Sequence, residues 1–198
     1  MKRGRDKFVK YEWLINIIII LANLLPSKIR EGLLVRFRFI SGIKGLLLRY
    51  VLIKTLARSC GKNVTIHPGV YIFHPKNLSL GNNVSIHPMC YLECGTTLDS
   101  GIIIGNDVSI AHGVSFIATS HIYTDVNKPI KDQGVDEKKI IVKDDVWIGA
   151  KATILYGRII ESGSIVASNS VVTHNVIKNT IVGGIPGKLI KSRVRQEY

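Results

Sequence analysis

Six histidines occur in the sequence, and His121 stands where the chain changes character. It lies near the start of a polar stretch, residues 118–139, which contains Pro129 and Gly134 and interrupts a regular aliphatic pattern. An imidazole with an unperturbed pKa of about 6.5 is mostly neutral at pH 7 and can accept a proton from a hydroxyl group. Long loops on a rigid scaffold often carry function, so we interpret His121 as a candidate general base.

The other histidines do not predict a zinc site. His67 and His87 each precede a proline, which indicates stacked turn corners, while His74, His112 and His174 lie elsewhere. A catalytic zinc ion needs three converging protein ligands and an open coordination position. We therefore expect no bound metal.

The elements that must position His121 are short strands. Aliphatic residues recur every six positions in three blocks, with a two-residue insertion after Ile72 and the polar stretch after Phe116. A six-residue period fits neither the 3.6-residue helical period nor the spacing of about 8–12 residues between sandwich strands. It predicts short strands joined by tight turns and stacked as parallel β-structure. The expected inward-pointing residues are Ile66, Ile72, Leu80, Ile86, Leu92, Leu98, Ile104, Ile110, Phe116, Val142, Ile148, Ile154, Ile160, Val166 and Val172.

Residues 1–60 differ from the repeat. Cations precede an apolar run over residues 13–25, which is short for a membrane-spanning helix of about 20 residues, and no small-residue cleavage site of a secreted protein follows. After Pro26, apolar residues interleave with cations and few acids. This pattern suits helices in an anionic headgroup layer. The alternative is a pair of helices packed on the main domain, and both interpretations stay open.

The basic charge is concentrated in the same segment. The chain carries 27 Lys and Arg against 14 Asp and Glu, a net charge of +13, of which residues 1–60 contribute 13 basic and 3 acidic side chains. The repeat region is nearly neutral, so we expect no nucleic-acid partner. Cys60, Cys90 and Cys94 cannot all pair, which indicates a reducing compartment.

Three segments, in order along the chain, resemble a known family. They read SIAHGVSFIATSH from Ser109, VKDDVWIGAKATIL from Val142 and SIVASNSVVTHNVIKNTIVGGIPGKLI from Ser164. With the six-residue period, they resemble the hexapeptide-repeat acyltransferases, in the branch of maltose, galactoside and nodulation-factor O-acetyltransferases and polysaccharide O-acetyltransferases. The resemblance covers residues 61–191. It implies a mainly β fold, a left-handed parallel β-helix with an N-terminal α-helical extension and one extruded loop, and it implies a homotrimer that uses acetyl-CoA as co-substrate.

The resemblance also implies roles for individual residues. His121 is the general base, the amide of Ala150 stabilises the oxyanion of the thioester, and Trp147 walls the site near the thioester. Small residues one coil apart form a groove for the pantetheine arm: Gly149, Ala150, Ala167 and Ser168.

Contacts to the coenzyme A phosphates depart from the family pattern. Relatives often carry a lysine after the threonine, whereas here Thr173 is followed by His174. We expect Thr173 still to contact coenzyme A. Flexible cations can bind phosphate from several positions, so we expect the charge from Lys178, Lys188, Lys191 or Arg193. The expected acceptor contacts are Tyr91, Glu93 and Asp125. The group that orients His121 stays open among Asp125, Glu93, Asp99, Glu137 and a backbone carbonyl.

The expected organisation is a basic helical segment (1–60), a β-helix acyltransferase domain (61–187) with the loop 118–139, and a C-terminal tail (188–198). The expected function is acetyl-CoA-dependent O-acetylation of a sugar or lipid-linked glycan in capsule, O-antigen or exopolysaccharide biosynthesis. The expected location is cytoplasmic, and peripheral binding to the inner face of the membrane through residues 1–60 stays open. The alternatives are a soluble small-molecule acetyltransferase of the xenobiotic or serine type and a zinc-dependent β-helix hydratase. The length of the acyl group stays open.

Overall fold

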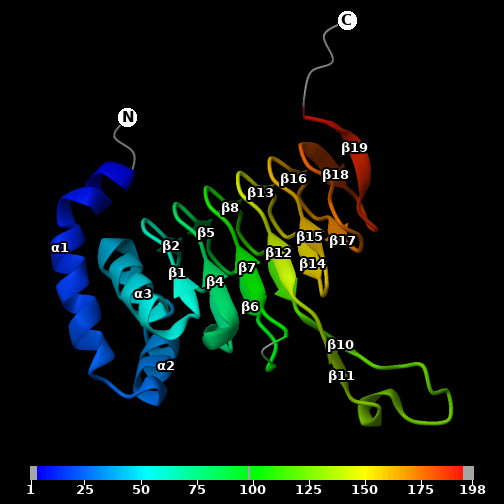
Figure 1. Ribbon diagram of the computed structural model, residues 1–198, viewed down its shortest axis with the longest axis horizontal. Helices are drawn as coiled ribbons and strands as arrows, with labels where there is room; N and C mark the ends of the chain where they lie inside the picture. Colours follow the sequence, from blue (N-terminus) through cyan, green and yellow to red (C-terminus); the bar gives the residue numbers. More distant parts are fainter. Residues whose placement is uncertain (1–3, 98, 194–198) are drawn as a thin grey trace, which may run out of the picture.

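The computed structural model describes residues 4–97 and 99–193. Three helices lie at one end of a long stack of short strands, and one hairpin projects far from the stack (Figure 1). The strands form three parallel walls of a left-handed β-helix, which confirms the predicted fold.

Each wall collects one strand from every coil, so neighbours in a wall are distant in sequence. Wall A contains β1 (Ser59–Cys60), β4 (Leu78–Leu80), β7 (Ile102–Ile104), β12 (Ile140–Val142) and β15 (Ile159–Ile160). Wall B contains β2 (Thr65–Ile66), β5 (Ser85–Ile86), β8 (Ser109–Ile110), β13 (Trp147–Ile148), β16 (Ile165–Val166), β18 (Thr180–Gly183) and β19 (Lys188–Ser192). Wall C contains β3 (Tyr71–Phe73), β6 (Tyr91–Glu93), β9 (Ser115–Ile117), β14 (Thr153–Leu155) and β17 (Val171–Val172).

The six-residue anchors fill the axis of the β-helix. Of the fifteen predicted anchors, thirteen are buried; Ile72 is partly buried and packs against the core, and Leu98 lies outside the described residues. Leu92 pairs with Phe116, 24 residues later, whereas Ile141 pairs with Ile159, 18 residues later. The six-residue rhythm therefore does not run through the wall between β6 and β7, and six residues leave it there as a turn.

Helix α3 (Gly42–Leu56) closes the N-terminal end of the stack, because its side chains Tyr50 and Ile53 join the β-helix core. Helices α1 (Gly4–Asn23) and α2 (Ser27–Arg36) pack on α3 (Figure 1). The alternative in which helices of residues 1–60 pack on the main domain therefore holds for α3. Within the described residues, no helix is long and apolar enough to cross a membrane.

A buried arginine fastens α3 to its surroundings. The Arg49 side chain is 1% exposed; Nε donates to the carbonyl of Ile66 at 2.7 Å, and Nη1 donates to the carbonyls of Phe37, Arg38 and Ile40 at 2.8–3.2 Å. Burial lowers the pKa of this guanidinium. These hydrogen bonds connect the end of β2 and the segment between α2 and α3 to one charged side chain.

We expect Arg49→Met to lower the free energy of unfolding by about 3 kcal/mol, because carbonyls that accept from a buried charge lose their donor. That loss corresponds to a fall in melting temperature of roughly 6–12 °C for a chain of this size. Lys44→Met, which removes an exposed cation from the same helix, is the control and is expected to change little. Equal melting temperatures for the two variants, measured by calorimetry, would contradict the fastening role.

The interruption in the repeat is a long hairpin. Strand β10 (Thr119–His121) pairs antiparallel with β11 (Val135–Glu137), and the short 3-10 helix η2 (Ile130–Asp132) lies between them. A second short 3-10 helix, η1 (Pro75–Asn77), precedes β4. The polar stretch therefore leaves the wall as an extruded loop, as predicted from its composition.

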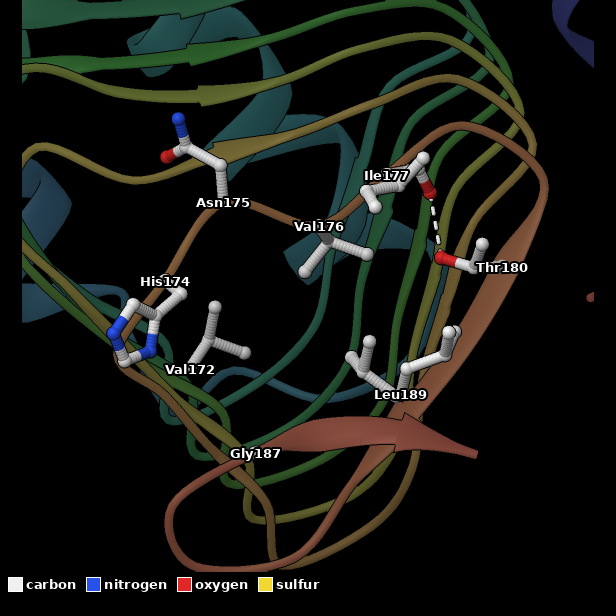
Figure 2. A pocket seen from close by; sticks show the side chains of 9 residues that line it. Val172, His174, Asn175, Val176, Ile177, Thr180, Gly187 and Leu189 are labelled. Atoms are coloured by element: carbon white, nitrogen blue, oxygen red, sulfur yellow. Dashed lines mark hydrogen bonds between the residues drawn. The ribbon is translucent and has the colours of Figure 1, made fainter. Parts of the chain in front are cut away.

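The C-terminal end of the stack differs from the predicted tail. Residues 188–192 form β19, which pairs antiparallel with β18, because the chain reverses at residues 184–187 and finds the unpaired edge of wall B. Next to this strand, the last coil leaves an open apolar pocket of about 170 Å³ (Figure 2). Its lining includes Val172, Val176 and Leu189, and the Thr180 hydroxyl donates to the carbonyl of Ile177 at 2.6 Å beside it.

Candidate active site

The turn at Gly149 joins wall B to wall C. The amide of Ala152 donates to the carbonyl of Gly149 at 3.4 Å, and Lys151 has a φ of +57°, so the turn resembles type II, whose second position favours proline. The same corner in the earlier coils carries Pro68 and Pro88 at the position of Ala150. The prediction that His67 and His87 mark stacked corners is confirmed, since their rings stack with centroids 4.9 Å apart.

The Ala150 peptide has an open donor. Its carbonyl accepts from the amide of Asn169 at 2.8 Å. Its N–H donates to no group among the described residues, and the residue is partly exposed. A free backbone N–H at a turn corner can donate to an anionic oxygen, as the predicted role of Ala150 requires. His112 occupies the same corner one coil earlier, where its carbonyl accepts from Lys151.

Small residues stack below this turn. A Cβ on Gly149 would lie 2.5 Å from the amide nitrogen of Ser168 and 2.9 Å from the carbonyl carbon of Ala167, so the two coils touch here through backbone. The pairing of β16 with β18 continues the column to Gly183, opposite Lys188 in β19. The structure therefore brings Gly149, Ala150, Ala167, Ser168 and Lys188 to one corner. The glycine at 149 is required by the contact between coils, a reason that the sequence pattern did not reveal.

Trp147 begins β13 in wall B, two residues before Gly149. Its side chain is 52% exposed and lines a pocket of about 290 Å³ together with Arg193 and Asp145. Arg193 is already engaged: Nη1 lies 2.9 Å from Oδ2 of Asp145 and donates to the carbonyl of Gly163 at 2.9 Å. Of the residues predicted to bind coenzyme A, Trp147 and Arg193 thus share a pocket.

The remaining predicted phosphate contacts are dispersed. Thr173 follows wall C, where its hydroxyl lies 2.9 Å from Nδ1 of His174. Lys178 is exposed in the turn that leads to β18, at the corner between walls A and B. The structure does not bring Thr173 or Lys178 next to the Gly149 turn.

His121 is exposed at the base of the hairpin, where it pairs with Val135. Its imidazole makes no hydrogen bond to another residue within the described ranges. Asp125 lies further along the loop, where its carboxylate accepts from the amide of Asn127 at 3.0 Å and its carbonyl accepts from Gln133. Glu93 sits at the loop base, since it pairs with Ile117 and its carbonyl accepts from Ala118.

Wall C presents aromatic side chains beside the loop base. The Tyr91 ring stacks on Tyr71 with centroids 5.8 Å apart and meets Phe73 edge-on at 5.6 Å. Burial, aided by Glu93 and Tyr71, raises the pKa of the Tyr91 hydroxyl. Tyr91 and Glu93 lie two residues apart on the same strand, so these two predicted acceptor contacts share one surface.

Glu137 holds the hairpin to the wall and does not orient His121, which corrects one of the candidates. Its carboxylate accepts from the amides of Thr96 and Thr97 at 2.9 Å and from the Thr96 hydroxyl at 2.8 Å. Burial raises the pKa of this carboxyl, but these hydrogen bonds and the Ser100 hydroxyl outweigh burial and lower it to about 2 from 4.5. The turn extruded between β6 and β7 is therefore the anchor of the hairpin.

We expect Glu137→Gln to raise the amide exchange rate in β10 and β11 about tenfold at pH 7. The substitution replaces the charge-assisted hydrogen bonds from Thr96 and Thr97 with weaker neutral ones. Because the folded pKa is depressed, the stabilisation is complete above pH 4.5 and fades as the pH falls toward 2. The difference in amide exchange rate between Glu137→Gln and wild type, after correction for intrinsic exchange, should therefore shrink as the pH falls from 4.5 toward 2.

Asp136→Asn is the matched control for this clasp. Asp136 lies on the same strand, and its carboxylate pairs with Lys138 at 2.9 Å, away from the Thr96 turn. Wild-type protection in Glu137→Gln at pH 7, or equal loss in both variants, would refute the anchoring role.

The cysteines do not supply a nucleophile. All three are buried and unpaired. Burial raises the pKa of Cys90 to about 11, and burial together with Glu93 raises that of Cys94 to about 12. Thiols with such pKa values carry almost no thiolate at neutral pH. Among the described residues, no three His, Cys, Asp or Glu side chains are grouped as a metal site requires.

Proteins of known name that resemble this chain in sequence include acetyltransferases. No family profile matches the chain. The putative lipopolysaccharide biosynthesis O-acetyl transferase WbbJ of Escherichia coli is 30% identical over 97 residues, 46% of this chain and 50% of that protein. The galactoside O-acetyltransferase of Escherichia coli is 28% identical over 146 residues, 72% of this chain and 68% of that protein. The chain spans about a third to a half of the length of the first curated relatives it matches.

Solved structures agree in fold. The hexapeptide-repeat acetyltransferase VCA0836 of Vibrio cholerae, complexed with acetyl coenzyme A, superposes with a TM-score of 0.71 at 26% identity and covers 84% of this chain and 86% of its own. The chain resembles the hexapeptide-repeat acetyltransferases in fold and in part of its sequence.

Proposed function

We propose that the protein transfers an acetyl group from acetyl-CoA to a sugar hydroxyl. The observation that carries the proposal is the Gly149 corner, where the open amide of Ala150 stands at the head of a column of small residues. Such a corner suits a thioester, because its carbonyl oxygen needs a donor and its narrow pantetheine arm needs backbone within reach. The relatives named as acetyltransferases support the same chemistry.

The co-substrate contacts follow from this placement. The pantetheine arm is proposed to run along Gly149, Ala167 and Ser168, with Trp147 as a wall. Lys188 stands at the end of the column, opposite Gly183, and is the phosphate contact that the geometry favours. Arg193 would have to break its ion pair with Asp145 before it could bind a coenzyme A phosphate. Lys178 and Thr173 lie at other corners of the β-helix, away from the Gly149 turn.

The proposed transfer is direct. His121 removes the proton of the acceptor hydroxyl, the oxygen forms a bond to the acetyl carbonyl carbon, and the Ala150 amide donates to the oxyanion. The intermediate collapses with cleavage of the carbon–sulfur bond, and His121 returns its proton to the leaving thiolate. The buried cysteines take no part, since their raised pKa values keep them protonated.

The two halves of the site lie on opposite edges of wall C within one chain. Ala150 precedes β14, whereas His121 follows β9, and these strands pair side by side. In this register Ala150 lies before the first paired residue, Thr153, whereas His121 lies beyond the last one on β9, Ile117, so the paired strands separate the two groups within one chain. We therefore propose that the site forms between neighbouring copies in a homotrimer, where the hairpin of one copy meets the corner of the next.

The proposed acceptor is a sugar of a lipid-linked glycan, in capsule, O-antigen or exopolysaccharide biosynthesis at the cytoplasmic face of the membrane. A relative named for lipopolysaccharide biosynthesis and another named for galactosides support a sugar. Tyr91 and Glu93 offer an aromatic face and a carboxylate at the loop base, and Asp125 lies on the loop above. Aromatic faces and carboxylates bind sugars through stacking and hydrogen bonds.

The test is release of free thiol from acetyl-CoA by the full chain in the presence of separate acceptors. We expect release with a hexose or a glycan and product heavier by one acetyl group. Serine, chloramphenicol and an amino sugar form the comparison arms. Release with one of those and with no sugar would replace the proposed acceptor, and failure to bind acetyl-CoA by calorimetry would overturn the proposal itself.

A further inference from the structure

The helices at the N-terminal end leave an apolar face uncovered. Trp13 is 66% exposed, Ile20 is 64% exposed and Leu24 is 77% exposed. We call the exposed side of α1 and of the turn that follows it the outer helical face, defined by Trp13, Ile17, Ile20 and Leu24. A soluble monomer rarely exposes so many large apolar side chains in one region, so the face calls for a partner.

The face follows from how α1 is seated. Trp13, Ile17 and Ile20 recur three or four residues apart and so share one side of α1, and Leu24 follows in the turn after the helix ends at Asn23. Ile15 on another side is buried in the core cluster, where α1 packs on α3. Because the Arg49 bonds fasten α3 to the β-helix, the exposed stripe of α1 cannot turn inward without losing that packing.

The charge around this face identifies the partner. Residues 11–58 contain two acidic and eight cationic side chains, of which Arg49 is buried and does not contribute to this surface. Lys28, Arg36 and Lys44 are exposed, on α2 and at the start of α3, whereas one of the two acids, Glu12, pairs with Lys62 at 2.7 Å. Large apolar side chains together with cations that form no ion pair among the described residues fit an anionic lipid surface, where apolar groups enter the acyl boundary and cations meet phosphates.

The rival partners fit less well. A second copy would bring equal positive charge against this face, which opposes association. A spanning insertion is not supported, because no described helix is long and apolar enough to cross a bilayer. Trp13 and Tyr11 have rings that prefer the interface between water and lipid.

We propose that the outer helical face binds the surface of an anionic bilayer, with α1 lying in the interface and the β-helix held above it. This inference extends the proposed function, since it would bring the site to a lipid-linked acceptor. The binding itself is independent of catalysis and can be measured without an acceptor.

The test is sedimentation of the full chain with vesicles of phosphatidylglycerol and phosphatidylcholine, compared with phosphatidylcholine alone. We expect binding to the anionic vesicles, weakened by added salt. Ile20→Glu should lower the partition coefficient about tenfold, because it places a carboxylate in the apolar face. Ile177→Glu is the matched control, since Ile177 is 68% exposed at the opposite end of the stack, and it should bind like wild type.

Three outcomes would overturn the proposal: no binding to anionic vesicles, equal binding to neutral vesicles, or a smaller oligomer for Ile20→Glu by light scattering, which would assign the face to contact between copies. Thiol release from acetyl-CoA with a soluble sugar is measured on the same samples. Ile20→Glu should retain that activity. Vesicle binding without thiol release would refute the proposed function alone, and thiol release without vesicle binding would refute this inference alone.

Discussion

Replacing His121 with alanine is expected to lower turnover at least about 100-fold, the usual share of a general base. The imidazole is exposed at the hairpin base, and β10 and β11 are held by backbone pairing and by the Glu137 clasp. The fold should therefore survive the change, because no described contact depends on the ring.

The measurement is the steady-state rate of thiol release, with circular dichroism and melting temperature as checks on the fold. His174→Ala is a suitable control, since that ring lies at the C-terminal end of the stack beside the apolar pocket (Figure 2). Turnover within a few-fold of wild type in His121→Ala would remove this residue from the mechanism.

Replacing Ala150 with proline is expected to lower turnover by about 100- to 1,000-fold, because it removes one N–H donor to the oxyanion, worth about 3 kcal/mol. The backbone should accept the change. The same corner already carries Pro68 and Pro88 in earlier coils, and the Ala150 N–H has no partner within the described structure. Few positions allow an amide to be deleted with so little disturbance.

Ala150→Ser provides the control, because it keeps the N–H and matches Ser168, the residue at this corner one coil later. It should keep turnover near wild type. Thermal unfolding of both variants should stay close to wild type. An Ala150→Pro variant that is stable and fully active would show that this amide does not meet the oxyanion.

Much of the fold could be predicted from sequence because its period is short. Thirteen of fifteen predicted anchors are buried, and the polar stretch leaves the wall as a hairpin. The six-residue spacing did not reveal the insertion between β6 and β7, where the strand register shows 24 residues between Leu92 and its partner Phe116. Spacing alone cannot distinguish a wall strand from an inserted turn of the same length.

The structural roles that could not be predicted from the sequence depend on contacts between residues far apart in the chain. Glu137 carries no local signal that its partners are Thr96 and Thr97, about 40 residues earlier. Arg49 resembles the other cations of the helical segment, and its burial follows only from the packing of α3. The Gly149 corner was predicted from the family motif, but the need for glycine there comes from Ser168 on the next coil.

In the proposed trimer, the His121 imidazole of one copy meets the Ala150 amide of another copy. This pairing is tested by co-expressing His121→Ala and Ala150→Pro chains, each nearly inactive alone, and by assaying the purified mixed oligomers. Random cyclic assembly pairs an intact imidazole with an intact amide at about one interface in four, so about a quarter of wild-type turnover should return. Mixed oligomers no more active than either parent would show that both groups act within one chain and would contradict a site shared between copies.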